Sequence, residues 1–151
     1  MKIVLYQPKI PQNTGNIVRT CSVTGVDLVL VEPLGFDISD KALRRAGLDY
    51  WNEVEVETIS DLDNFLENYP GKFYFFSSKA SKNYSEIKYK MNDLLIFGSE
   101  TSGLPDHLYD LYPDKFVTMP MLPDSRCLNL SNAAAIAVYE AWRQNDFILK
   151  S

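Results

Sequence analysis

The sequence predicts an α/β protein with a mainly parallel sheet and helices on both faces. Short strands and helices alternate along the chain, and several strands are continuous apolar runs, such as Phe73–Phe76 (FYFF) and Leu94–Phe97 (LLIF). Such runs indicate strands buried on both faces, which is typical of a parallel sheet covered by helices. The chain has 151 residues, so we expect one domain over residues 1–151.

The elements are predicted in order from apolar periodicity, capping residues and turn formers. Strands are expected at Lys2–Tyr6, Asp27–Val31, Val54–Thr58, Phe73–Phe76, Leu94–Phe97 and Phe116–Met119. Helices are expected after an N-cap at Asn13 or Thr14, after Ser39 around Leu43 and Ala46, from Ser60 to Pro70, over Asp106–Tyr112, and over Ala133–Trp142 after an N-cap at Ser131. Gly25 and Gly47 are the expected ends of the first two helices.

The composition disfavours several classes of protein. A net charge of −5 argues against non-specific coating of nucleic acid, which depends on neutralising phosphates. Two isolated cysteines, Cys21 and Cys127, predict reduced thiols in a cytoplasmic protein rather than a disulfide scaffold or a zinc site. With His107 as the single histidine, a histidine metal site lacks ligands, and no metal is expected. No apolar run is long enough to span a membrane.

Three polar clusters follow predicted strands. They are Asn13–Arg19 (NTGNIVR), Gly98–Gly103 (GSETSG) and Ser125–Asn132 (SRCLNLSN). The second is the most informative, because a buried strand followed by a glycine-rich polar loop is typical of the ligand-binding edge of a parallel sheet. Glu100 is its only carboxylate, and Asn16 and Arg19 lie one helical turn apart in the first cluster. Taken singly, each cluster is also compatible with helix caps and surface residues.

Dinucleotide and nucleoside triphosphate sites fit the sequence less well. Neither GxGxxG after the first strand nor GxxxxGK[ST] is present. The last predicted helix, in contrast, is apolar nearly all round from Ala133 to Tyr139, and a helix without a polar face is buried on more than one side. Either this is the central core helix of a monomer, or a second subunit supplies the cover. We favour the second and expect a homodimer built on the last and first helices, with Tyr139 and Trp142 near the interface.

Four segments together resemble one family. They are IPQNTGNIVRTC, LRRAGLDYW, FGSETSGLP and MPMLPDSRCLNLSNAAAIAVYEAWRQ. These segments, and essentially the whole chain, are similar to the SPOUT-class RNA methyltransferases, in the small single-domain branch that methylates the 2′-hydroxyl of cytidine or uridine 34 of tRNA. The resemblance implies a SPOUT α/β fold with a C-terminal trefoil knot. It also implies S-adenosylmethionine as cofactor, S-adenosylhomocysteine as product, and the anticodon stem-loop of tRNA, with leucine isoacceptors the expected substrates.

The resemblance also implies roles for individual residues. Cofactor contacts, mostly through backbone, are expected at Phe76, Ser77, Gly98, Met119, Cys127 and Leu128. Catalytic roles are expected for Arg19, Asn16, Glu100 and Asn129. Contacts with RNA are expected from Lys41, Arg44, Arg45, Lys79, Lys82 and Arg126. Cys127 departs from the family pattern, in which many relatives carry serine, and a thiol is the weaker hydrogen-bonding group.

The chemistry leaves the proton acceptor open. Arginine stays protonated in proteins, so Arg19 would hold the neighbouring phosphate, and either that phosphate or Glu100 would receive the proton of the hydroxyl. Two other functions compete with this one. They are a non-catalytic RNA- or nucleotide-binding dimer that keeps the cofactor pocket, and an α/β enzyme that acts on a small metabolite.

Overall fold

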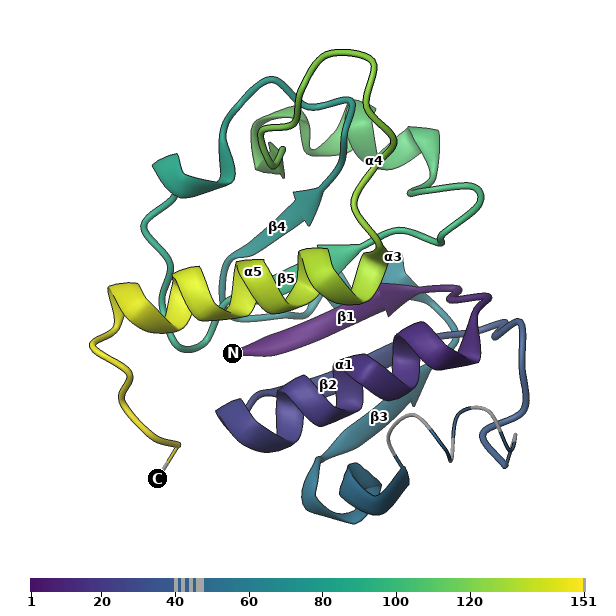
Figure 1. Cartoon of the computed structure of the whole chain (residues 1–151). Helices are drawn as coiled ribbons and strands as arrows, with labels where there is room; N and C mark the ends of the chain where they lie inside the picture. Colours follow the sequence, from purple (N-terminus) through teal and green to yellow (C-terminus); the bar gives the residue numbers. More distant parts are fainter. Residues whose placement is uncertain (40, 42, 44, 46–47, 151) are drawn as a thin grey trace.

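The computed structural model describes residues 1–39, 41, 43, 45 and 48–150. Within them, six strands form one sheet in the order β3-β2-β1-β5-β4-β6, and every pairing is parallel (Figure 1). The strands are β1 (Lys2–Tyr6), β2 (Asp27–Val31), β3 (Val56–Ile59), β4 (Phe73–Phe76), β5 (Leu94–Phe97) and β6 (Phe116–Val117). The predicted fold class, a parallel sheet in an α/β protein, is therefore confirmed. The trefoil knot stays a prediction.

Helices cover both faces of the sheet (Figure 1). They are α1 (Pro11–Thr24), α3 (Leu62–Glu67), α4 (Asp106–Leu111) and α5 (Leu130–Gln144), with 3-10 turns η1 (Leu48–Glu53), η2 (Tyr84–Glu86) and η3 (Pro113–Lys115). The helix predicted between Ser39 and Gly47 involves residues 40, 42, 44, 46 and 47, which lie outside the described residues, as does the RNA-contact prediction for Arg44. No helix in the described part of the chain has the length and apolar character needed to cross a membrane.

The core is divided by the sheet into two layers. Ile3 and Leu5 of β1 pack on one face against α1 and α5, through buried side chains such as Val18 and Ala137. Val4, between them in sequence, points to the other face, where α3 and α4 supply buried leucines. Alternate residues of a strand point to opposite faces, so a fully apolar β1 requires helices on both sides.

Two strands differ in extent from the prediction. β3 covers Val56–Ile59 instead of Val54–Thr58, because Val54 still closes the turn of η1, donating from its N–H to the Trp51 carbonyl oxygen at 3.3 Å. β6 stops at Val117 instead of Met119, since β4, the strand with which it pairs, ends at Phe76, opposite Val117. The N–H of Thr118 then donates to the Lys82 carbonyl oxygen at 2.8 Å, outside the sheet.

The predicted helix starts were wrong at three places. α1 begins at Pro11, with Ile10 in the cap position, so Asn13 and Thr14 lie buried within its first turns. α3 is capped by Asp61, whose Oδ1 accepts from the Asn64 N–H at 3.0 Å, and not by Ser60. The α5 N-cap is Asn129 rather than Ser131, as described below. The predicted end of α1 is confirmed, because Gly25 takes a left-handed φ of 72° and donates to the Cys21 carbonyl oxygen.

Candidate active site

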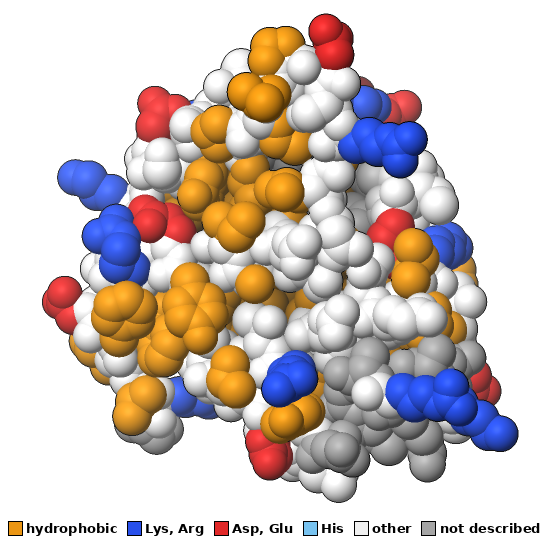
Figure 2. All heavy atoms as spheres, viewed as in Figure 1, with side chains coloured by type: hydrophobic (Ala, Val, Ile, Leu, Met, Phe, Trp, Pro, Cys, Tyr) orange, Lys and Arg blue, Asp and Glu red, His pale blue; other side chains and the backbone are white. Residues whose placement is uncertain are grey.

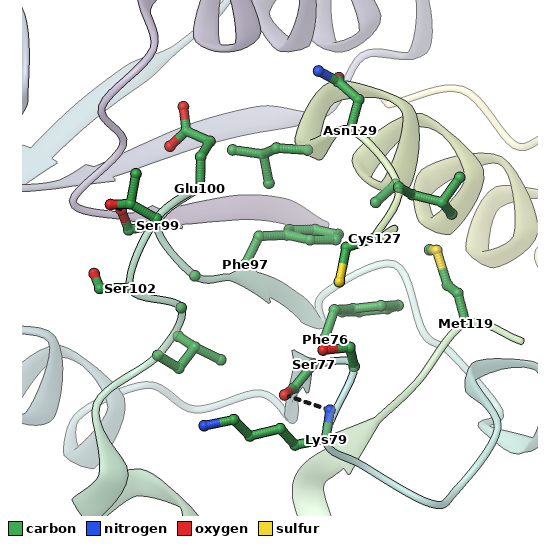
Figure 3. A pocket seen from close by; sticks show the side chains of 18 of the residues that line it. Phe76, Ser77, Lys79, Phe97, Ser99, Glu100, Ser102, Met119, Cys127 and Asn129 are labelled. Carbon is green, nitrogen blue, oxygen red and sulfur yellow. Dashed lines mark hydrogen bonds between the residues drawn. The ribbon is translucent and has the colours of Figure 1, made fainter. Parts of the chain in front are cut away.

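A cavity of about 560 Å³ opens at the carboxyl ends of β4 and β5 (Figure 3). Strand register brings these ends together, because Phe76 lies beside Phe97 of β5 on one side and Val117 of β6 on the other. The rings of Phe76 and Phe97 stack with centroids 4.7 Å apart and form part of the wall. Other apolar residues of the lining are Ile10, Leu104, Met119, Met121, Leu128, Leu130 and Ala133. The volume and the mixed lining are those of a small-molecule site.

The loop after β5 closes on itself at its base. The Ser99 N–H donates to the Gly103 carbonyl oxygen at 3.1 Å, and the Gly103 N–H donates to the Ser99 carbonyl oxygen at 3.0 Å. A Cβ on Gly98 would lie 2.4 Å from the Gly103 carbonyl carbon, so only glycine permits this close approach of backbone. Gly103 itself has a φ of +66°. The glycine pair therefore fixes the rim of the cavity, while Thr101 and Ser102 remain exposed at the tip.

Glu100 joins this loop to the start of α1. Its carboxylate accepts hydrogen bonds from the backbone N–H of Lys9 at 2.9 Å and of Ile10 at 2.7 Å, and from the Asn13 side-chain amide at 3.2 Å. The first N–H groups at a helix end lack partners within the helix, and here a carboxylate from another segment supplies one. Glu100 therefore positions α1 against the cavity.

Asn13 extends the connection to α5. Its Oδ1 accepts from the Asn129 side-chain amide at 2.9 Å, and Asn129 Oδ1 in turn accepts from the Ser131 N–H at 2.9 Å. Asn129 thus caps α5 and contacts α1 with the same side chain. The chain Glu100–Asn13–Asn129 unites all three polar clusters predicted from the sequence. Asn13 is itself buried, and its role was not predicted because its partners lie far away in sequence.

The cavity gathers most of the residues predicted for the site. All six residues expected to contact the cofactor line it, namely Phe76, Ser77, Gly98, Met119, Cys127 and Leu128. Glu100, Asn129 and Lys79 also line it (Figure 3). The remaining described candidates, Asn16, Arg19, Lys41, Arg45, Lys82 and Arg126, are exposed and do not belong to the lining.

Arg19 lies on the exposed side of α1, with Asn16 one turn before it. Its guanidinium carbon is 5.2 Å from the ring centroid of Tyr50 in η1, a cation–π distance. No ion pair with Arg19 is found among the described residues. An arginine held by its face on an aromatic ring keeps its N–H edge free for an anion.

The two cysteines have different environments. Cys21 is buried on the inner side of α1, and burial, followed by the charge of Asp27, raises the pKa of its thiol to about 12. Cys127 is exposed and lines the cavity. Across the described part of the chain, no group of three or more His, Cys, Asp or Glu residues is placed to hold a metal ion.

Comparison with known proteins assigns the class. Residues 1–139 match the model of the SpoU rRNA Methylase family, and the chain belongs to this family of methyltransferases. A relative from Methylovorus glucosotrophus, named tRNA (cytidine(34)-2'-O)-methyltransferase, is 47% identical over 147 residues, which cover 96% of each chain.

Solved structures agree with this assignment. One, described as giving insight into the 2-OH methylation of C/U34 on tRNA, is 39% identical with a TM-score of 0.88, over 96% of this chain and 95% of that one. The SpoU methyltransferase AviRb from Streptomyces viridochromogenes, in complex with AdoMet, has a TM-score of 0.85 over 97% of this chain and 58% of that one. At 22% identity, AviRb supports the fold alone.

Proposed function

We propose that this protein transfers a methyl group from S-adenosylmethionine to the 2′-hydroxyl of nucleotide 34 of tRNA, a cytidine or a modified uridine. The main support is the 47% identity, along 96% of both chains, to an enzyme named for this reaction. A catalytic function is favoured over the non-catalytic RNA-binding dimer for the same reason. A small-metabolite enzyme has no comparable support.

The cavity suits S-adenosylmethionine. Its volume of about 560 Å³ is in the range of cofactor sites, and its wall combines the stacked Phe76 and Phe97 rings with backbone at Gly98. The aromatic wall offers a surface for an adenine, and the glycine pair lets backbone approach the ligand closely. When bound, the cofactor supplies a methyl group activated by a positively charged sulfur, so the protein has mainly to place the hydroxyl and remove its proton.

Of the two candidate proton acceptors, an RNA phosphate is favoured over Glu100. Three hydrogen bonds already occupy the Glu100 carboxylate oxygens and hold them toward the start of α1. Arg19, with its N–H edge free, would bind the phosphate next to the reacting ribose bidentately and orient it. Asn129 would fix the loop beside the reacting group.

The substrate is proposed to be the anticodon stem-loop, with leucine tRNAs first among the isoacceptors to test. An exposed loop with splayed bases suits a short chain with a net charge of −5 better than a long duplex does. Lys41, Arg45, Lys82 and Arg126 are exposed candidates for phosphate contacts. Roughly three to five such contacts predict a slope of log affinity against log salt of about −2 to −4.

Purified leucine tRNA incubated with labelled cofactor should gain a 2′-O-methyl at nucleotide 34 and nowhere else. Nuclease digestion and mass spectrometry of the fragments locate the methyl group. An anticodon stem-loop with a 2′-deoxy residue at 34 is the matched control, since it lacks only the acceptor hydroxyl. Methylation at another position, or equal methylation of unstructured RNA, would refute this substrate.

A homodimer is proposed from the surface of α5. Tyr139 and Ile136 are 46% and 41% exposed, although the opposite side of α5 is buried in the core through residues such as Ala137 and Val138. Tyr139, Trp142 and Phe147 form a continuous aromatic patch, with adjacent ring centroids 5.7 and 5.2 Å apart. Figure 2 shows hydrophobic side chains gathered over the C-terminal half of α5. An apolar cluster of this kind favours contact with a second copy.

Light scattering at micromolar concentration should give about twice the 17.2 kDa mass of one chain. Tyr139→Glu should shift the population toward the monomer, because it puts a charge in the aromatic patch. Leu111→Glu, at a 61% exposed position of α4 on the other face of the sheet, is the control and should leave the mass unchanged. A wild-type mass of one chain would refute the dimer.

A further inference from the structure

Lys79 is the only lysine or arginine among the described residues that line the cavity. Figure 3 shows its side chain extending along one edge of the cavity beneath Ser102, opposite Asn129 and Glu100. None of the ion pairs found among the described residues involves Lys79. At one end the cavity therefore has a positive charge without an ion-pair partner among the described residues, while at the other its one carboxylate, Glu100, is engaged by the start of α1.

A local network fixes where this charge lies. The Lys79 N–H donates to Ser77 Oγ at 3.2 Å, and Ser77 Oγ is 2.6 Å from the Tyr109 hydroxyl of α4. The Lys79 ammonium lies 5.9 Å from the centroid of the Tyr109 ring. Tyr109 thus holds the turn after β4 through Ser77 and supports the ammonium with its ring face. The side chain of Lys79 is exposed, and the contact with Tyr109 places its ammonium beside the cavity.

The rest of the lining indicates what kind of anion the ammonium would meet. The rings of Phe76 and Phe97 suit the adenine end of the cofactor, and Ser102 and the Lys79 ammonium lie to one side of these rings (Figure 3). S-adenosylmethionine carries its only anionic group, a carboxylate, at the end remote from adenine. We infer that Lys79 binds this carboxylate, with Ser77 and Tyr109 as its positioning residues. The inference rests on the cofactor assignment of the proposed function.

Two nucleoside ligands separate the contact between Lys79 and the carboxylate from the other contacts of the cofactor. S-adenosylhomocysteine has the carboxylate, whereas 5′-methylthioadenosine keeps adenosine and sulfur but lacks the amino-acid part. In calorimetric titrations, Lys79→Met should weaken S-adenosylhomocysteine about tenfold and change 5′-methylthioadenosine less than about twofold. Lys79→Arg keeps the charge and should restore most of the lost affinity. Lys88→Met removes an exposed lysine that does not line the cavity and should change neither ligand.

The outcomes separate this inference from its alternatives. An equal loss for both ligands in Lys79→Met would overturn it, because Lys79 would then only shape the cavity. Unchanged affinity for S-adenosylhomocysteine with weaker tRNA binding would also overturn it and assign Lys79 to an RNA phosphate. If wild-type protein bound neither ligand, the cofactor assignment itself would fail, and the inference with it. Absence of methylation at nucleotide 34 would refute the proposed substrate and leave the ligand comparison standing.

Discussion

Arg19→Ala is expected to reduce the rate of methyl transfer to tRNA about a thousandfold while leaving the affinity for S-adenosylhomocysteine unchanged. The guanidinium lies outside the cavity lining, so its removal takes no contact from the cofactor. Its free edge is the group proposed to hold the phosphate at the reacting ribose, and the loss of one such charged contact in a transition state is worth several powers of ten in rate. Single-turnover rates and calorimetry on the same preparation measure the two effects.

Two variants make this result interpretable. Arg19→Lys keeps the charge but not the fork of N–H donors, and it should recover only part of the rate. Arg143→Ala removes an exposed arginine of α5 that contacts Glu140, and methyl transfer should be unaffected. Equal loss of rate and of cofactor affinity in Arg19→Ala would show instead that Arg19 supports the cavity.

Glu100→Ala is expected to lower the free energy of unfolding by about 2 kcal/mol and the Tm by about 4–8 °C. The substitution leaves the N–H groups of Lys9 and Ile10 and the Asn13 amide without their acceptor. Because Glu100 is only half-buried, water can replace part of the loss, and the expected cost is set near the lower end for charged hydrogen bonds. Denaturant unfolding and thermal melting measure it.

Glu67→Ala is the matched control, since it removes an exposed carboxylate on α3 and should change stability by less than about 0.5 kcal/mol. A Glu100→Ala protein with unaltered Tm and no methyl transfer would contradict the positioning role described above. It would favour Glu100 as the acceptor of the proton instead.

The strands were predictable because their cause is local. A run such as LLIF or FYFF is buried on both faces of the sheet, and that burial is visible in the sequence itself. Helix starts were less predictable, because the groups that accept hydrogen bonds from the first N–H groups of a helix are not always nearby in sequence. The backbone N–H of Ile10 at the start of α1 is bound by Glu100, 90 residues away, and no residue next to Pro11 indicates this.

In the candidate site, too, features with a local cause could be predicted and those set by distant contacts could not. Glycine and polar residues after an apolar strand pointed to the loop at Gly98, and this loop does form the rim of the cavity. Charge pattern alone, however, could not distinguish Lys79 from Lys82. The two are three residues apart in one basic segment, yet only Lys79 lines the cavity, because the turn held by Ser77 and Tyr109 directs it there.

The hydrogen bond between Asn13 and Asn129 joins residues 116 positions apart, and this separation has a consequence for how the protein is made. Translation produces α1 early, but Cys127, Leu128 and the start of α5 are synthesised more than a hundred residues later. Until that segment leaves the ribosome, one side of the cavity does not exist. Ligand binding stabilises only a state that can bind. The cofactor can therefore stabilise the protein only after α5 has docked, and it gives no help to the elements that fold before then.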